Sequence, residues 1–318
     1  MKIVYVIIIL CLLLMVGAGF YRFLSGRRLI VDPIEAYRIN RLSLDAADAI
    51  WQKKEKSAIV VSLTSIPSRI PHIENTLKTL LTQSLAPRRI ELNIPEFSFR
   101  EQRPYVIPDA IGRLEGVTVL PCKDFGPATK LIPALLRHGP DQAIVAVDDD
   151  YLYPKNMLKN FHEGMKRYPN VVLANSGWIV PPDCLDRPTT FWSDLWSIPP
   201  TPSLSTRLKT PKEVDIIQGY SGYLVCPGFF DKNAIQAHDT APKALWFVDD
   251  VWISAHVNAP KYVLPAKRFC FSEIGKNAFY KGTSLANINR GDGSLESRNN
   301  TIGIRHFKEK WLFNGSHR

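Results

Sequence analysis

Short apolar runs and helically spaced apolar positions alternate through the first half of the chain. Five runs, each rich in β-branched residues, predict buried strands at 58–63, 89–94, 116–120, 143–147 and 171–174. Apolar residues with helical spacing predict helices at 73–81, 130–137 and 154–168. This pattern predicts an α/β fold with a Rossmann-like, mainly parallel mixed sheet and flanking helices.

The pattern changes in the second half. Residues 180–212 are rich in Pro, Thr, Ser and Trp, which predicts a long ordered loop of the kind that often carries function. Trp192 and Trp196 in this loop are candidates for stacking on a sugar ring, with aromatic core packing as the alternative for each. A strand is predicted at 214–218, and the glycines of 219–222 permit a ligand to approach the backbone.

The amino-terminal segment is an uncharged apolar run from Ile3 to Phe20, about long enough to span a bilayer. A cleaved signal peptide is the alternative, although the sequence at 17–20 is a poor cleavage site. We therefore expect a single-pass membrane anchor at 1–21, a polar stem at 22–56, a globular domain at 57–265 and a basic extension of that domain at 266–318. Arginines follow the apolar run, which predicts a cytosolic domain; the Golgi lumen is the alternative.

The net charge of +10 is concentrated near the end of the chain, where the segment from Lys261 onward carries an excess of seven basic residues. Such an excess of basic residues favours binding to nucleic acid, to an anionic membrane or to a phosphorylated ligand. Nucleic acid is disfavoured because the sequence has no zinc-finger, RNP-like or helix-turn-helix motif. Four cysteines outside the anchor lack a CxxC pair, which argues against zinc but leaves disulfides or free thiols open; they are Cys122, Cys184, Cys226 and Cys270.

Three consecutive carboxylates, Asp148, Asp149 and Asp150, end the predicted strand at 143–147. Ligands of α/β folds bind at this carboxyl edge of the sheet. Adjacent acids repel one another and resist burial, so they need a cation. Oxygen ligands suit Mg²⁺ or Mn²⁺, which commonly bridge to substrate phosphates. A solvated acidic turn is the alternative interpretation.

Two further segments carry candidate chemistry. Asp249 and Asp250 precede an apolar helical pattern, where one can cap the helix and a partly buried carboxylate can act as a general base. Asp124 and Lys130 flank a Gly-Pro pair after the third predicted strand. There Asp124 is placed to accept from a nucleobase N–H and Lys130 to approach a phosphate, with an ordinary capped turn as the alternative.

Four segments, in this order, resemble the nucleotide-diphospho-sugar glycosyltransferases of the GT-A fold: Val60–Arg69, Phe125–Leu131, Asp148–Asp150 with Tyr153-Pro154, and Asp249–Trp252. The resemblance implies that Asp148 and Asp150 form the DxD motif, which holds a divalent metal (Mn²⁺ or Mg²⁺) and the donor diphosphate. His306 is a further candidate metal ligand. The implied donor-binding residues are Thr64, Arg69, Asp124, Lys130 and Asp149. Asp250 is the implied catalytic base, with Asp249 as the alternative.

The resemblance therefore implies a metal-dependent transferase, and the apolar run at Ile3–Phe20 adds a membrane anchor. It would move a sugar from a nucleotide-diphosphate donor, by default a UDP-sugar, to a hydroxyl of a glycan or glycoconjugate acceptor, with inversion. The acceptor would contact Gly219, Tyr220, Gly222 and Trp192, and four basic side chains would help stabilise the leaving diphosphate: Lys267, Arg268, Lys276 and Lys281. Two alternatives stay open: a haloacid-dehalogenase-type phosphohydrolase, and a catalytically inactive carbohydrate-binding module.

Overall fold

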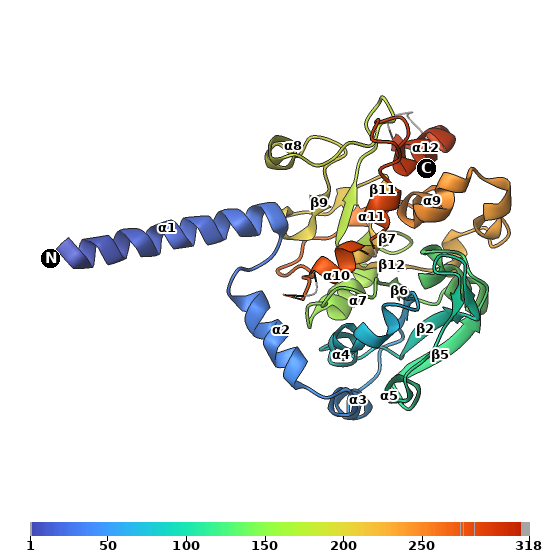
Figure 1. Cartoon of the computed structure of the whole chain (residues 1–318), viewed down its shortest axis with the longest axis horizontal. Helices are drawn as coiled ribbons and strands as arrows, with labels where there is room; N and C mark the ends of the chain where they lie inside the picture. The colour runs from blue at the N-terminus through green and yellow to red at the C-terminus, as the bar shows by residue number, and fades with distance from the viewer. Residues whose placement is uncertain (1, 274, 276, 283, 313–318) are drawn as a thin grey trace.

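An eight-stranded mixed sheet forms the centre of the computed structural model, which describes residues 2–273, 275, 277–282 and 284–312. The strand order is β10-β13-β7-β12-β6-β1-β2-β5 (Figure 1). The strands are β1 Val60–Leu63, β2 Arg89–Pro95, β5 Val117–Cys122, β6 Ile144–Ala146, β7 Val172–Ala174, β10 Lys212–Glu213, β12 Tyr223–Val225 and β13 Lys261–Val263. All run in one direction except β12 and β10, so the predicted mixed, mainly parallel sheet is confirmed.

Two small antiparallel sheets lie outside the central one. The first joins β11 (Ile216–Ile217), β8 (Ser176–Trp178) and β9 (Ser203–Leu204), and the second pairs β3 (Phe97–Ser98) with β4 (Arg103–Pro104). The strand predicted at 214–218 therefore exists as β11 but belongs to a small sheet. The segment predicted as a long loop is largely irregular, although it contains α8 (Phe191–Leu195) and β9.

Helices cover both faces of the central sheet. Besides α8, the α-helices of the domain are α4 Glu74–Leu81, α5 Asp109–Gly112, α6 Ile132–Arg137, α7 Met157–Arg167, α9 Asp249–His256, α10 Asn277–Gly282, α11 Leu285–Ile288 and α12 Asn299–His306, of which α12 packs on α9. The strands alternate in the faces they present: Ile144 and Ala146 pack into one hydrophobic cluster, whereas Val145 and Val147 pack into the other. Burial on both faces explains why β6 is apolar throughout.

The amino-terminal helix α1 (Lys2–Ser25) projects away from the rest of the molecule (Figure 1). Its segment Val4–Ser25 is long and apolar enough to cross a membrane, by length and composition alone. Two shorter helices follow, α2 (Val31–Arg41) and α3 (Leu44–Gln52). The third packs on α4, and the Asp48 carboxylate accepts hydrogen bonds from the backbone amides of Glu115 and Gly116.

All five cysteines lie in the described part of the chain, and each is a free thiol. Of the two possibilities that the sequence leaves open, the structure therefore shows thiols.

Candidate functional site

The ends of three parallel strands meet at one edge of the central sheet. Thr64 follows β1, Asp124 follows β5, and the acidic triplet Asp148–Asp150 follows β6. The first turn of α9 brings Asp249 and Asp250 to the same place. The contact that joins the two acidic segments is made by Lys130, whose Nζ lies 2.6 Å from Asp148 Oδ1 and 2.7 Å from Asp249 Oδ2.

Lys130 is the internal cation of this cluster. Its side chain is only 6% exposed, and its Nζ also lies 3.9 Å from Asp250 Oδ1. Burial by itself lowers the pKa of Lys130, but the charges of Asp148, Asp249 and Asp250 outweigh it and raise this pKa well above the ordinary value. The ammonium group therefore stays charged at any physiological pH.

Gly219 makes room for this ammonium group. A Cβ at position 219 would lie 2.0 Å from Lys130 Nζ and 2.7 Å from its Cε, so any side chain here displaces the lysine. The Gly219 backbone amide also donates a 2.9 Å hydrogen bond to Asp250 Oδ1. The space beside the backbone that Gly219 leaves free is therefore occupied by the Lys130 ammonium group.

A second internal cation, Arg69, neutralises the other half of the triplet. Its Nη1 lies 3.1 Å from Asp149 Oδ1 and 3.2 Å from Asp150 Oδ2, and Ser65 Oγ also donates to Asp149. The guanidinium lies over the ring of Tyr280 at 5.1 Å, an arrangement that favours the cation. The triplet is therefore balanced by two side chains that arrive from different directions.

Two carboxyls of the cluster titrate near neutrality. Burial, followed by the charges of Asp149 and Asp148, raises the pKa of Asp150 to about 7. Burial, followed by repulsion from Asp249, raises the pKa of Asp250 to about 8 although Lys130 opposes the shift. A carboxyl with such a pKa suits proton transfer at physiological pH.

The donor chemistry at this edge fits a hard divalent cation. Asp148 and Asp150 offer carboxylate oxygens, and their side chains keep 30% and 20% exposure. However, Asp148 contacts Lys130 and Asp150 contacts Arg69, so a metal between them must compete with both cations. Within the described ranges, no three acidic, histidine or cysteine side chains are grouped so that they could hold a metal ion.

Two connected cavities open at the cluster. The inner cavity, of about 110 Å³, is lined by Thr64, Arg69, Arg100, Tyr105, Asp124, Lys130, Asp148, Asp149 and Trp246, among others. The outer cavity, of about 770 Å³, is lined by residues that include Tyr220, Asp250, Arg290 and Arg298. Lys130, Asp148 and Asp249 belong to both linings. A ligand that fills both cavities must therefore pass directly over the acidic cluster.

Several residues that the sequence suggested also hold the local backbone. Asp124 accepts hydrogen bonds from the amides of Phe99 (3.0 Å) and Gly126 (2.7 Å), and Thr64 Oγ1 donates to the Asn93 carbonyl. Tyr220 packs its ring on Tyr151 at 5.3 Å, in the wall of the outer cavity. Gly222 has a φ of +82°, a left-handed conformation that favours glycine.

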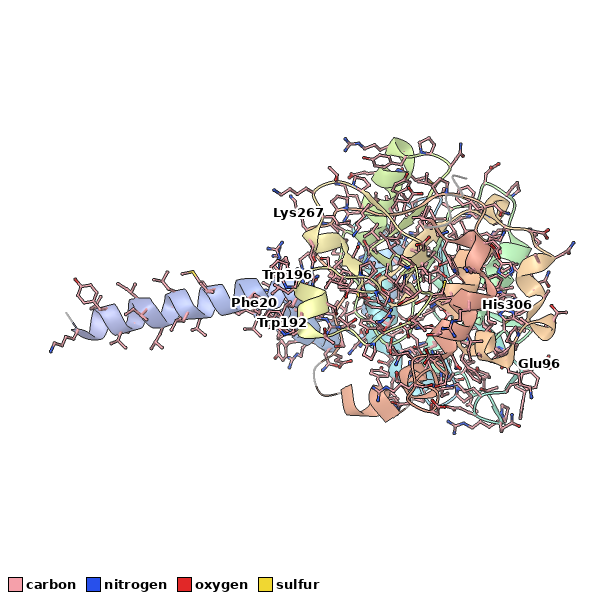
Figure 2. The ribbon with its side chains drawn as sticks, turned by 90° about the horizontal axis from the view of Figure 1, so that it is seen from above. Phe20, Glu96, Trp192, Trp196, Lys267 and His306 are labelled. Atoms are coloured by element: carbon pink, nitrogen blue, oxygen red, sulfur yellow. The ribbon has the colours of Figure 1, made fainter. Side chains whose placement is uncertain are left out.

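The structure does not bring Trp192 or His306 to this cluster. Trp192 is 64% exposed and lies at the base of α1, while His306 is exposed on α12 at the opposite side of the domain (Figure 2). Neither lines either cavity. The exposed positions of Trp192 and His306, outside both linings, give no support to Trp192 as an acceptor-binding residue or to His306 as a metal ligand.

The basic tail contributes different cations from those suggested by the sequence. Arg268 pairs with Asp32 and Glu35 of α2, at 2.6 Å from each, and so holds α2 against the domain. Lys267 is exposed beside the α1–α2 link, where its carbonyl accepts from Arg28. Lys276 and the side chain of Lys281 lie outside the described residues.

Sequence reasoning missed several cavity residues, including charged and aromatic ones. Arg100 lies in the turn between β3 and β4 and Tyr105 directly follows β4, and strands of two residues leave no hydrophobic periodicity that could mark them. Trp246 directly precedes the second acidic segment, and its proximity to Asp249 and Asp250 was the available signal. The basic excess of the tail pointed toward Arg290 and Arg298 without distinguishing them from other cations.

Comparisons with known proteins give distant likenesses only. No protein-family model matches the chain, and no curated protein matches it. The S. aureus TarS fragment 1–349 in complex with UDP is 16% identical, with a TM-score of 0.37 over 72% of this chain and 64% of that chain. The mannosyltransferase PcManGT from Pyrobaculum calidifontis, in complex with GDP-Man and Mn²⁺, is 17% identical, with a TM-score of 0.43 over 86% of this chain and 75% of that one.

The chain spans slightly less than two thirds of the TarS fragment. Similarity at these TM-scores does not establish a shared activity.

Proposed function

We propose that this protein is a nucleotide-sugar glycosyltransferase of the GT-A type, which moves a sugar from a nucleoside-diphosphate donor to a hydroxyl of a glycan or glycoconjugate. The observation that carries the proposal is the meeting of two acidic segments, about a hundred residues apart, around Lys130 at the wall shared by two cavities. One cavity serves the donor and the other the acceptor. The chemistry takes place over the shared wall.

The inner cavity suits the nucleotide part of the donor. Tyr105 and Trp246 offer aromatic surface for a base, and Thr64 and Asp124 line the same cavity with polar groups. Arg69 and Arg100 add positive charge for phosphates. At about 110 Å³ the cavity is small, so the diphosphate and the sugar extend over Lys130 and Asp148 into the outer cavity.

Asp148 and Asp150 are the residues proposed to hold Mn²⁺ or Mg²⁺. Such an ion supplies positive charge that stabilises the leaving diphosphate. Asp149 keeps its ion pair with Arg69 and its hydrogen bond from Ser65, and these contacts hold the loop after β6 in position. Arg290 and Arg298 add positive charge to the wall of the outer cavity.

Asp250 is the proposed general base. The acceptor oxygen attacks the anomeric carbon, the bond from that carbon to the diphosphate oxygen breaks, and its electron pair leaves with the nucleoside diphosphate. The acceptor proton passes to Asp250, whose pKa of about 8 allows it to keep the proton. Attack opposite to the leaving group inverts the anomeric configuration. Gly219 and Tyr220 border the acceptor side, whereas Trp192 has no part in this step.

The geometry favours transfer over phosphohydrolysis. In a hydrolase of the haloacid dehalogenase type, the nucleophilic aspartate normally lies near the start of the domain. Here the triplet follows β6, and its three carboxylates are ion-paired to Lys130 or Arg69. A carboxylate held by a buried cation is a weak nucleophile.

We propose further that α1 anchors the protein in a membrane as a single-pass helix. Its length and composition support this, and none of its apolar segment is buried by the domain. The arginines after the span favour a cytosolic domain over a lumenal one.

A binding and product assay on the full chain tests the proposed activity. We expect a UDP- or GDP-sugar to raise the midpoint of thermal unfolding, more so with Mn²⁺, because a ligand specific for the native state stabilises it. Nucleoside diphosphate should be released only when an acceptor is present. Asp148→Asn should lose the stabilisation, whereas the control Asp183→Asn, in an exposed pair with Arg187, should keep it.

Three outcomes contradict the proposal. Release of inorganic phosphate in place of nucleoside diphosphate favours the phosphohydrolase. Sugar binding without turnover favours a binding module. Failure of every nucleotide sugar to stabilise the protein removes the donor assignment.

A further inference from the structure

An apolar surface is exposed on α8, beside the base of α1. We call it the α8 face; it consists of Phe191, Trp192, Trp196 and Ile198, which are 49%, 64%, 70% and 52% exposed. Figure 2 shows Trp192 and Trp196 next to Phe20, where α1 enters the domain. Adjoining exposed side chains of this size and apolarity are uncommon on a soluble surface and mark a contact site.

The α8 face is fixed to the end of α1. Arg207 donates to the carbonyls of Phe23 and Leu24, the latter at 2.5 Å, in the last turn of that helix. The same side chain donates to Asp194 Oδ1 at 2.9 Å and to the Asp194 carbonyl at 3.2 Å. Since Arg207 is 8% exposed, this bridge is rigid and holds α8 at a set height along α1.

The height of the α8 face matches the edge of a bilayer. A helix needs about 20 residues to cross the hydrocarbon core, so a span that begins at Val4 ends near Phe23. The ring of Phe191 contacts that of Phe20 at 6.0 Å between centroids, which places α8 level with the last turn of the span. Tryptophan is the residue enriched at this depth, where its ring meets both lipid and water.

Basic residues border the same region. Arg22 lies in the last turn of α1, and Arg28 follows it and donates to the carbonyl of Lys267. Cations at this height attract lipid phosphates. On the α2 side of the base, Leu29 and Ile30 are also 52% and 68% exposed, so apolar surface continues around the anchor.

We propose that the α8 face is a second membrane contact, which inserts Trp192 and Trp196 into the interfacial layer of the bilayer that α1 spans. This inference rests on the proposed anchor. It assigns to Trp192 a lipid partner in place of the sugar that its position in a long loop had suggested. The anchor alone leaves the domain free to rotate about one helix, whereas a second contact sets its orientation on the membrane.

Quenching of tryptophan fluorescence by brominated lipids tests the proposal on the full chain in liposomes. Of the seven tryptophans, Trp192 and Trp196 are the exposed ones, so lipids brominated near the headgroup end of the chain should quench them selectively. The double variant Trp192→Phe/Trp196→Phe should lose most of this quenching. Both proteins should float with the liposomes, because α1 is intact in each.

A matched control adds one tryptophan to that double variant on the far side of the domain. Phe97→Trp suits this purpose, because Phe97 is 40% exposed and its neighbour Glu96 lies far from α1 (Figure 2). Its added fluorescence should not be quenched.

The outcomes separate the two proposals. Protein that does not float contradicts the anchor. Protein that floats but shows equal quenching in the wild type and the double variant overturns the lipid contact and leaves the anchor intact. A third outcome is that the emission of Trp192 and Trp196 shifts with protein concentration and is not quenched by lipid. This result assigns the α8 face to a second copy of the chain and also overturns the proposal.

Discussion

Replacement of Lys130 by methionine removes the charge that joins the two acidic segments and keeps a side chain of similar length. In the native protein Lys130 Nζ contacts Asp148 and Asp249 and approaches Asp250. Without it, three carboxylates share a site that has no other cation within ion-pair distance among the described residues. We expect the Lys130→Met protein to be strongly destabilised and unable to bind donor.

The magnitude follows from the burial of the pair. Removing one partner of a buried ion pair costs about 3–5 kcal/mol, because the remaining charge is left uncompensated. Lys130 is 6% exposed and touches two carboxylates closely, so its loss belongs to this range. For a domain of this size, such a loss corresponds to a fall of roughly 10 °C in the unfolding midpoint.

The destabilisation should depend on pH. A carboxyl whose pKa is higher in the folded than in the unfolded protein reduces stability as the pH rises from the unfolded pKa to the folded one. Asp250, with a pKa of about 8, already behaves in this way, and because Lys130 lowers this pKa, loss of the lysine raises the pKa of Asp250 further. The penalty of Lys130→Met should therefore be largest near pH 8 and should shrink toward about pH 5, where Asp250 is protonated.

Thermal and denaturant unfolding, followed by tryptophan fluorescence between pH 5 and pH 8, measure the effect. Lys78→Met is the control, since Lys78 is also 6% exposed but has a single half-exposed acidic partner, Glu74, at 3.6 Å. It should cost about 1 kcal/mol or less, with little change across this pH range. Equal losses for the two variants, or a Lys130→Met penalty that does not vary with pH, would refute the reasoning.

Four further predictions concern activity and orientation. Asp250→Asn should fold and bind donor but transfer about 10²–10⁴ times more slowly, and normal turnover in Asp250→Asn with loss in Asp249→Asn would assign the base to Asp249. In the wild type, kcat/KM should fall as the pH drops below about 8, because Asp250 takes up its proton. In Asp249→Asn this fall should occur at a lower pH, because repulsion from Asp249 raises the Asp250 pKa. Asp150→Ala should lose the Mn²⁺-dependent part of donor binding, which full activity in excess EDTA would contradict. Protease should reach the domain from the cytosolic side of sealed vesicles; glycan at Asn299, whose Nδ2 now donates to Asn289 at 3.0 Å, would show the opposite orientation.

The regular elements near the amino-terminal half of the domain were predictable because their signals are local. The strands β1, β2, β5 and β6 and the helices α4, α6 and α7 are confirmed, since a buried strand or an amphipathic helix reveals itself within a few residues. The antiparallel strand β12 was not predicted. It is three residues long, and its place between β6 and β7 depends on partners distant in sequence.

The position of candidate chemistry was also visible in the sequence. Because parallel strands present their carboxyl ends at one edge, residues that follow β1, β5 and β6 had to lie close together, and Thr64, Asp124 and Asp148 do line one cavity. The same reasoning cannot predict where side chains outside such strand ends lie. His306 was suggested by the family resemblance and Trp192 by its place in a long loop, and neither lines a cavity in the structure.

The sequence by itself determined the class of fold, the edge at which the acids gather and the need of those acids for a cation. Only the tertiary structure decided which cations meet that need. Adjacent carboxylates require positive charge wherever they lie, and this is a property of residue type. Lys130 reaches Asp249 because the packing of α9 against the sheet brings together residues more than a hundred positions apart, with Gly219 leaving the space for its ammonium group. No local sequence pattern predicts this contact between Lys130 and Asp249.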